Sequence, residues 1–191
     1  MIDFRKTAFI KSAPTYLDKP TKDLPEVLFV GKSNVGKSSL INALANNKNL
    51  AFASSKPGFT KLLNYFEVDN TFYLVDAPGY GYTISGNRHL DSFAQMMESY
   101  FKNPKLVGVV FIVDSRHKLG ENDVDFYHFI KDNNIPFILV ASKVDKLNQS
   151  EKAAMKKNIA NACEDADFVA VSTLKGVGID TLKMRISALI K

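Results

Sequence analysis

The sequence predicts an α/β domain with a mostly parallel sheet flanked by helices. Short apolar runs alternate with longer segments whose apolar residues recur every three or four positions. Most connections between the apolar runs are long enough to carry a helix, which parallel strands require. The chain of 191 residues has no internal repeat or low-complexity segment, so it suits one domain with a substantial core.

The apolar runs place six expected strands along the chain. Residues 62–68 and 71–75 are separated only by Asp69-Asn70, a short hairpin signal, so one antiparallel edge strand is expected. The remaining strands follow helical connections and are expected to be parallel. The six expected ranges are 27–30, 62–68, 71–75, 107–113, 137–141 and 168–171.

Two segments carry the apolar stripe of a helix that packs on a sheet. Asn148 followed by Glu151 predicts a capped start for another helix. Cys163 lies in helical register with Met155 and Ile159, so we expect it to fill the core rather than act as a nucleophile. The two stripes are Phe93, Met97, Tyr100 and Phe101, and Leu182, Ile186, Leu189 and Ile190.

The N-terminal segment has a different character, with Pro14, Pro20 and Pro25 in or just after it. Proline removes a backbone donor and disfavours helix and central strand. We therefore expect residues 1–23 to be an extended lead-in and residues 24–191 to form the domain.

Composition limits the classes of function. The chain has 25 Lys and Arg against 20 Asp and Glu, a net charge of +5 with a pI near 9.1. This balance suits a protein that approaches RNA and equally suits an ordinary soluble domain. No apolar run reaches the roughly 18 residues of a membrane span, no signal-peptide pattern is present, and a single cysteine fits a reducing compartment. We expect a cytoplasmic monomer without a membrane partner.

Residues Gly31–Ser38 match the phosphate-binding loop pattern G-x-x-x-x-G-K-[ST] at every fixed position. An apolar strand precedes the match and a helix pattern follows it, which is the setting that this loop requires. The glycines let backbone N–H groups surround an anion, and the helix N-terminus adds its unpaired N–H groups. Lys37 is expected to reach the β- and γ-phosphates of a nucleotide, and the Ser38 hydroxyl to bind Mg²⁺.

Asp76–Gly79 form a D-x-x-G sequence at a strand end. This position places the Asp76 carboxylate near the Mg²⁺ shell, through water, and lets the Gly79 N–H meet the γ-phosphate. Taken alone, Asp-x-Pro-Gly is also an ordinary turn. Its order after the phosphate-binding loop favours the nucleotide role.

Ser142–Asp145 follow a buried strand and resemble the guanine-reading motif N/T-K-x-D. The Asp145 carboxylate can accept two N–H bonds from guanine, whereas adenine presents no such pair of donors. Lys143 is expected to lie along the purine face. After the last strand, Ser172 and nearby backbone N–H groups are expected to support Asp145 and the guanine oxygen.

These motifs, in this order, resemble a Ras-like P-loop GTPase domain of the translation-factor-related class. From about Phe9 to the C-terminus the chain more closely resembles the EngB (YihA/YsxC) family of ribosome-biogenesis GTP-binding proteins. The resemblance implies a six-stranded, mostly parallel sheet with one antiparallel edge strand and flanking helices. It also implies a GTP-hydrolysing switch that assists assembly of the large ribosomal subunit, through rRNA and ribosomal proteins, with a family link to cell division and septation. The runs that carry it are 24–27, 31–44, 55–60, 76–82 and 113–117.

Three residues depart from the family pattern: Phe59, Ala77 and Ser142 stand where arginine, leucine and threonine are usual. Thr60 is the expected first-switch threonine, which would meet Mg²⁺ and the γ-phosphate only when GTP is bound. Mg²⁺ is expected on Ser38 and Thr60 directly and on Asp76 through water. The expected GTP contacts are Gly31, Lys32, Ser33, Asn34, Val35, Gly36, Lys37, Ser38, Ser39, Pro57, Gly58, Thr60, Asp76, Gly79, Ser142, Lys143, Asp145, Ser172 and Thr173.

The means of hydrolysis is the open part of the prediction. Thr60, Gly79 and Lys37 are expected to contact the transition state, but Tyr80 stands where Ras has the glutamine that orients water. A phenol with a pKa near 10 is a poor base at neutral pH, so slow intrinsic hydrolysis is expected, stimulated by a partner or K⁺. Asn34 occupies the loop position of an asparagine that helps hold K⁺ in potassium-activated relatives, and it can equally serve only a backbone hydrogen bond.

Several surface features have two interpretations. Arg116 and His117 are expected to be anchored locally rather than to act in catalysis. Tyr80 and Tyr82 are either exposed in a mobile second switch or packed against the neighbouring helix, and residues 85–89 are expected to be a flexible part of that switch.

Two other functions stay open. One is a P-loop kinase of small molecules, which would leave the motif at residues 142–145 without a purpose. The other is a GTP-binding adaptor without useful turnover.

Overall fold

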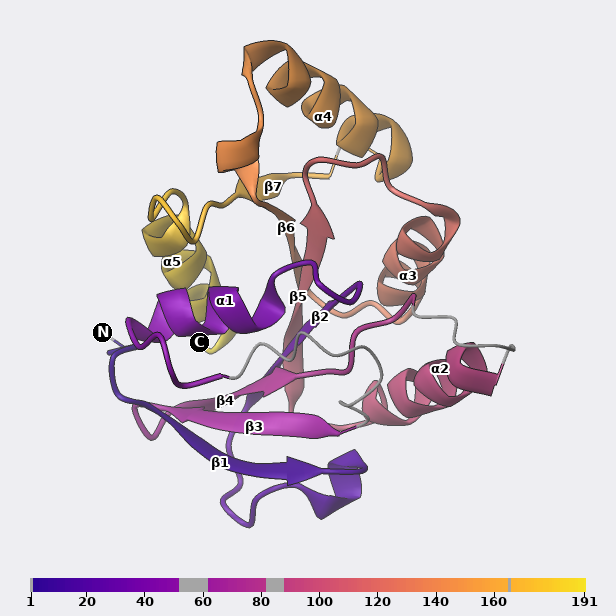
Figure 1. Cartoon of the computed structure of the whole chain (residues 1–191). Coiled ribbons are helices and arrows are strands. Elements are labelled where there is room, and N and C mark those ends of the chain that lie inside the picture. The colour runs from indigo at the N-terminus through magenta and orange to yellow at the C-terminus, as the bar shows by residue number, and fades with distance from the viewer. Residues whose placement is uncertain (1, 52–61, 82–87, 165) are drawn as a thin grey trace.

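The computed structural model describes residues 2–51, 62–81, 88–164 and 166–191, leaving aside the side chains of residues 88–92. Within these residues, seven strands form one sheet in the order β1-β3-β4-β2-β5-β6-β7 (Figure 1). Only β3 runs antiparallel to its neighbours, β1 and β4, and the other pairs are parallel. The strands are β1 Thr7–Ala13, β2 Glu26–Gly31, β3 Leu63–Val68, β4 Phe72–Asp76, β5 Leu106–Asp114, β6 Phe137–Ser142 and β7 Phe168–Ala170.

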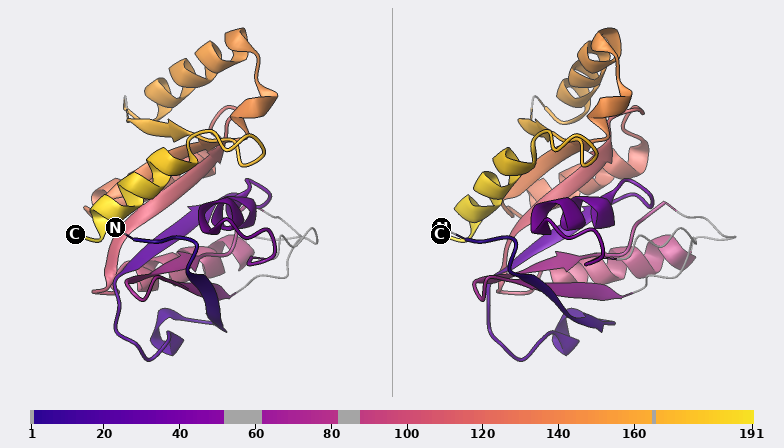
Figure 2. Two further views of the ribbon diagram at one scale, coloured as in Figure 1. Left: turned by 90° about the vertical axis from the view of Figure 1, so that its left-hand side faces the viewer. Right: turned by 60° about the vertical axis from the view of Figure 1, so that its left-hand side comes forward.

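Helices cover both faces of the sheet (Figure 2). Buried residues of α1 and α5 pack on one face, and those of α2, α3 and α4 pack on the other. Such coverage suits parallel strands, because their crossover connections place helices on the faces. The helices are α1 Lys37–Ala45, α2 Arg88–Tyr100, α3 Glu121–Asp132, α4 Gln149–Ala162 and α5 Ile179–Leu189, with the short 3₁₀ turns η1 Tyr16–Asp18 and η2 Val144–Lys146.

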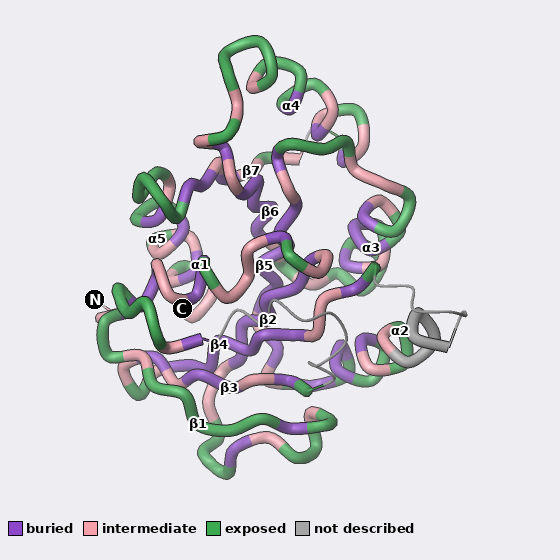
Figure 3. The backbone as a smooth tube through the Cα atoms, in the orientation of Figure 1, coloured by how far each residue is buried: buried purple, intermediate pink, exposed green. Residues whose placement is uncertain are grey.

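Burial follows the order of the sheet. Every residue of β2 and β4 is buried, whereas most residues of the edge strand β1 are exposed (Figure 3). The apolar run Val27–Val30 therefore contributes to both faces of the core, as expected for a strand covered on two sides.

The expected fold class is confirmed, and each of the six expected strands is found within one residue at either end. The strand count and the edge were predicted wrongly. Residues 7–13 of the expected lead-in form a seventh strand, β1, so the antiparallel strand β3 lies second in the sheet rather than at its edge. The β1 sequence gave no strand signal because its side chains do not alternate between buried and exposed positions, and a register irregularity lies between Phe9 and Lys11.

The local predictions of turn and cap are confirmed. Asp69 and Asn70 both have positive φ, 46° and 55°, as the central residues of a turn of the primed type require, and the Thr71 N–H closes this turn on the Val68 carbonyl at 2.8 Å. Strand pairing begins at Val68 and Phe72, so the connection has three residues. At the start of α4, the Asn148 side chain accepts from the Glu151 N–H at 2.9 Å and the Glu151 carboxylate accepts from the Asn148 N–H at 2.7 Å. These reciprocal bonds form the capping box that the spacing predicts.

The helical stripes and the cysteine lie where expected. Met97 and Tyr100 on α2, and Leu182 and Ile186 on α5, are buried. Cys163 is fully buried, and its burial raises the pKa of the thiol to about 11. A thiol that holds its proton at neutral pH is a poor nucleophile, so Cys163 is a core residue.

A polar cluster is buried at the start of β2, at the opposite end of that strand from Gly31. Glu26 accepts hydrogen bonds from the Tyr100 hydroxyl and, at 2.9 Å, from the Asn103 amide. Burial raises the pKa of Glu26 above its ordinary value despite these bonds.

Among the described segments, no helix has the length and apolar character needed to span a bilayer.

Candidate nucleotide-binding site

The predicted motifs meet at one edge of the sheet. Strands β2, β4, β5, β6 and β7 all point the same way, so the loops that follow them lie together. In open α/β sheets the crevice beyond the carboxyl ends of the strands is the usual place for a ligand. The fold therefore brings the residues predicted to hold phosphate, metal and base onto a common edge.

The phosphate-binding loop runs from the end of β2 to the start of α1. Gly36 is the residue before α1 and has φ 107°, a conformation that favours glycine. Asn34 also has positive φ, 63°, which Asn tolerates better than most residues. The loop thereby turns its chain into the N-terminus of α1, where Lys37 and Ser38 form the first turn with unpaired N–H groups.

Lys143 joins the predicted base-reading motif to the phosphate-binding loop. Its ammonium donates to the Asn34 carbonyl at 2.6 Å and lies 2.9 Å from the Asp114 carboxylate. Lys143 itself has φ 62°, so the chain turns sharply at this point to direct the side chain across the loop. One lysine thus fixes the position of the loop relative to β5 and β6.

Ser142 performs a similar structural task. Its hydroxyl is buried and lies 2.8 Å from the Val35 carbonyl and 3.0 Å from the Val113 carbonyl. A hydroxyl has one proton, so it donates to one of them at a time. The serine that departs from the family pattern therefore still contacts the phosphate-binding loop.

The two residues predicted to read guanine, Asp145 and Ser172, lie after β6 and β7. The Ser172 hydroxyl, fully buried, donates to Asp145 Oδ1 at 2.7 Å, and the Lys175 N–H donates to the Ser172 hydroxyl at 3.1 Å. The hydrogen bond from Ser172 lowers the pKa of Asp145, so the carboxylate is ionised at neutral pH. The predicted support of Asp145 by Ser172 is confirmed as a contact, while Thr173 is exposed.

The described residues that are predicted to hold the metal, Asp76 and Ser38, lie at the end of β4 and the start of α1. Asp76 is 7% exposed, and its Oδ1 has no hydrogen-bond partner among the described residues. Burial raises the pKa of Asp76 to about 6, against the lowering effect of the nearby Lys37. A buried carboxylate oxygen without a partner is costly unless a ligand or metal shell satisfies it, so these residues fit a hydrated Mg²⁺.

The chain after Asp76 packs directly on the phosphate-binding loop. The Ser33 N–H donates to the Tyr80 carbonyl at 3.0 Å, and the Ser33 hydroxyl lies 3.3 Å from the Gly79 carbonyl. A Cβ added to Gly79 would lie 2.7 Å from Ser33 Cα, so only glycine permits this approach. Tyr80 is buried against Phe93 and Phe126, which confirms the packed alternative for this tyrosine.

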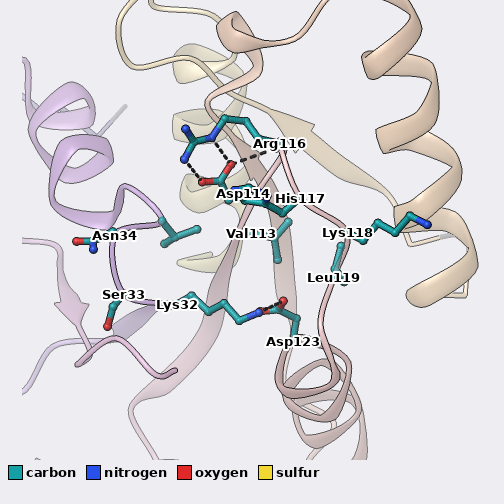
Figure 4. Close-up of a pocket in the computed structure, with 11 residues that line it drawn as sticks. Lys32, Ser33, Asn34, Val113, Asp114, Arg116, His117, Lys118, Leu119 and Asp123 are labelled. Atoms are coloured by element: carbon teal, nitrogen blue, oxygen red, sulfur yellow. Dashed lines mark hydrogen bonds and ion pairs between the residues drawn. The ribbon is translucent and has the colours of Figure 1, made fainter. Parts of the chain in front are cut away.

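A pocket of about 320 Å³ lies on the α3 side of the same loop (Figure 4). Arg116 forms part of its wall and is held by Asp114, with two contacts of 2.9 and 2.8 Å. Burial would raise the pKa of Asp114, but hydrogen bonds from Arg116 and Lys143 outweigh it and hold that pKa well below its usual range. The expected local anchoring of Arg116 is confirmed.

Comparison with known proteins gives consistent results. A family model described as 50S ribosome-binding GTPase matches residues 26–143. A probable GTP-binding protein EngB of Mesoplasma florum is 46% identical over 183 residues, which cover 92% of this chain and 91% of the relative. A probable GTP-binding protein EngB of Latilactobacillus sakei is 40% identical over 185 residues, which cover 95% of this chain and 93% of the relative. The chain belongs to the EngB family of GTP-binding proteins.

Solved structures agree with this membership in the EngB family. The crystal structure of a probable GTP-binding protein engB has a TM-score of 0.71 and 26% identity, covering 86% of this chain and 98% of that one. A structure of Era in complex with MgGDPNP and nucleotides 1506–1542 of 16S ribosomal RNA has a TM-score of 0.64 and 28% identity, covering 85% and 55%. As a member of the EngB family the protein is a GTPase, which disfavours the kinase alternative.

Some predicted residues of this EngB-family chain cannot be compared with the structure. Pro57, Gly58 and Thr60 of the first switch lie outside the described residues, as do Tyr82 and most of the run 85–89. Sequence reasoning also overlooked two carboxylates at the site, Asp114 and Asp123. The pattern of Gly120 followed three residues later by an acid signals a helix start, but nothing local indicates the partners of that acid.

Proposed function

We propose that this EngB-family GTPase is a Mg²⁺-dependent, GTP-driven switch that assists assembly of the large ribosomal subunit in the cytoplasm. The nucleotide part is supported by two contacts of the motif at residues 142–145: Ser172 donates to Asp145, and Lys143 donates to the Asn34 carbonyl of the phosphate-binding loop. The ribosomal part is supported by the description of the matching family model and by the net charge of +5. A role in cell division and septation, and a monomeric state, belong to the same proposal.

Guanine selection follows from the Asp145 carboxylate. Ionised and held by Ser172, it can accept from the two N–H donors of guanine, whereas adenine would leave it partly unpaired. GDP and GTP are expected to bind at least about a hundredfold more tightly than ADP and ATP. Asp145→Asn should weaken guanine binding and improve xanthine binding, because the amide reverses the donor pattern. Equal affinity of the wild type for ATP and GTP would refute this assignment.

The phosphates and the metal would be bound by residues of the phosphate-binding loop, the first switch and the end of β4. Lys37 would contact the β- and γ-phosphates, with Ser38 and Thr60 binding Mg²⁺ directly and Asp76 through water. Bound Mg²⁺ would neutralise phosphate charge. Lys37→Ala should weaken both nucleotides, whereas Thr60→Ala should weaken GTP more than GDP. An equal loss of both nucleotides in Thr60→Ala would contradict the switch assignment.

Hydrolysis is expected to need a stimulating partner or ion in addition to the residues of the described site. The Tyr80 hydroxyl is committed to Asp123, and burial together with that carboxylate raises the pKa of the phenol far above its ordinary value. It therefore cannot act as a base at neutral pH. We propose stimulation by the ribosomal partner, by K⁺ near Asn34, or both. Turnover with K⁺ against Na⁺, with and without large subunits, tests each; no stimulation by subunits would favour the adaptor alternative.

Binding to the large subunit or its precursor should depend on the nucleotide. A ligand shifts a switch only through its different affinities for the two states, so binding should be tighter with a non-hydrolysable GTP analogue than with GDP. The rRNA part of the contact should weaken as salt rises, because phosphate contacts release counterions. Co-sedimentation at two salt concentrations with each nucleotide measures both effects. Failure to co-sediment in every state would remove the ribosomal part of the proposal.

A further inference from the structure

The carboxylate of Asp123 occupies an unusual position. It lies in the first turn of α3, is 5% exposed, and accepts from three donors. Tyr80 donates its hydroxyl to Oδ1 at 2.8 Å, Lys32 donates its ammonium to Oδ2 at 2.7 Å, and the Gly120 N–H donates to Oδ2 at 2.9 Å. Asp123 belongs to none of the motifs described above.

Two of these donors come from the loops that surround the phosphate position. Lys32 is the second residue of the phosphate-binding loop, and Tyr80 directly follows the D-x-x-G glycine. One carboxylate on a third element therefore connects both loops, and Figure 4 shows its pairing with Lys32 across the edge of the pocket. The bond from Gly120 is an ordinary helix cap, but the other two bonds have no capping role.

The backbone contacts show what this connection holds. Lys32 and Tyr80 form a parallel bridge, and the Ser33 N–H donates to the Tyr80 carbonyl. The Tyr80 ring packs in one cluster with Phe93 and Phe126, with centroid distances of 5.5 and 5.8 Å to them, and its hydroxyl reaches Asp123 of α3. Asp123 holds the Tyr80 hydroxyl and Ser33 holds the Tyr80 carbonyl, so Tyr80 is fixed at both its side chain and its backbone. The preceding residue, Gly79, is thereby held in place as well.

We propose that Asp123 is a positioning residue that holds Gly79 and Tyr80 against the phosphate-binding loop and thereby strengthens the binding of GTP relative to that of GDP. The inference rests on the proposed contact of the Gly79 N–H with the γ-phosphate. GDP has no γ-phosphate, so the position of Gly79 matters only for GTP. If Asp123 served only the stability of the fold, its replacement would change the affinities for both nucleotides or for neither.

The test compares the affinities of GDP and a non-hydrolysable GTP analogue for purified full-length protein. Tyr80→Phe removes one hydroxyl and leaves Asp123 paired with Lys32 and Gly120, so the fold is expected to persist. Because a hydrogen bond to a charged group is lost, the GTP analogue should bind about tenfold more weakly, with GDP affinity unchanged within about twofold. Asp123→Ala also releases Lys32 of the phosphate-binding loop, so it should weaken the GTP analogue at least as much as Tyr80→Phe does and should weaken GDP less than the analogue.

Tyr127→Phe is the matched control. Tyr127 lies one turn further along α3, and its buried hydroxyl donates to the Cys163 carbonyl at 2.8 Å, away from both loops. This variant also loses one buried hydrogen bond of a phenol, here to a neutral carbonyl, and should bind both nucleotides as the wild type does. Asp123→Asn should lie between wild type and Asp123→Ala, because its Oδ1 still accepts from Tyr80 while its amide cannot accept from Lys32.

The outcomes separate the alternatives. Selective loss of the GTP analogue in Tyr80→Phe and Asp123→Ala supports the inference. Unchanged affinities in Tyr80→Phe, or parallel losses of GDP and analogue, would overturn it even if Asp123→Ala proved too unstable to measure. A wild type that binds neither guanine nucleotide would instead refute the proposed function on which the inference rests.

Discussion

Replacing Asp76 by asparagine should stabilise the nucleotide-free protein while damaging its nucleotide chemistry. The Asp76 carboxyl group is 7% exposed at the end of β4, and its Oδ1 has no partner among the described residues. Burial raises the pKa of this group to about 6, from an ordinary value of 3.8. The negative charge is therefore less stable in the folded state than in the unfolded state, whereas an amide carries no charge.

The size and sign of the effect follow from proton linkage. A rise of roughly two pKa units corresponds to about 3 kcal/mol at ~1.4 kcal/mol per unit. Well below pH 3.8 the carboxyl is protonated in both states and imposes no penalty. Between about pH 4 and pH 6 the folded state binds more protons, so wild-type stability from this group falls as pH rises. The free energy of unfolding of Asp76→Asn, minus that of wild type, should thus increase by about 3 kcal/mol across that window.

Urea unfolding from pH 4 to pH 7.5, with a chelator and without nucleotide, measures this difference. Far-UV circular dichroism is the suitable signal because the chain has no tryptophan. Hydrogen bonds that the new amide fails to make would displace the whole difference curve without changing its pH dependence. Saturating Mg²⁺ and GDP should stabilise the wild type more than the variant. A difference that stays flat between pH 4 and pH 7, or that falls, would refute the reasoning.

Three further predictions concern separate parts of the molecule. Lys143→Met removes the charged hydrogen bond to the Asn34 carbonyl, so GDP titration should show binding weaker by about 10- to 100-fold. Glu26→Gln removes a buried carboxyl whose pKa is raised by burial, so in the same urea series its stability relative to wild type should increase as pH rises; no pH dependence would contradict this. Asn148→Ala removes the cap that bonds the Glu151 N–H and should cost about 1 kcal/mol, lowering Tm by about 2–4 °C with GDP affinity unchanged.

The sequence was most informative where a feature is local. The phosphate-binding loop, the capping box at Asn148 and the hairpin at Asp69 each depend on residues within a few positions of one another, and each contact or conformation is present. The buried strands were also found to within one residue, because strands covered on both faces read as continuous apolar runs.

The features that the sequence did not reveal depend on distant partners. Strand β1 exists because residues 7–13 pair with β3, and its exposed side chains leave no periodic signal. The role of Asp123 depends on Lys32, 91 positions away, and Tyr80, 43 positions away. Neither separation leaves a local pattern, so an acid in the first turn of a helix looked like an ordinary cap.

The sheet order also affects how the chain folds during synthesis. Strand β1 ends at Ala13, but its partner β3 is complete only at Val68, about 55 residues later. At about 5–20 residues per second, the first strand waits roughly 3–11 s for its partner. During that interval Phe9 and Ile10, which stay partly exposed even in the folded protein, have no sheet to pack on. Residues 7–13 are therefore among the parts of the chain most vulnerable to pairing with a neighbouring nascent chain.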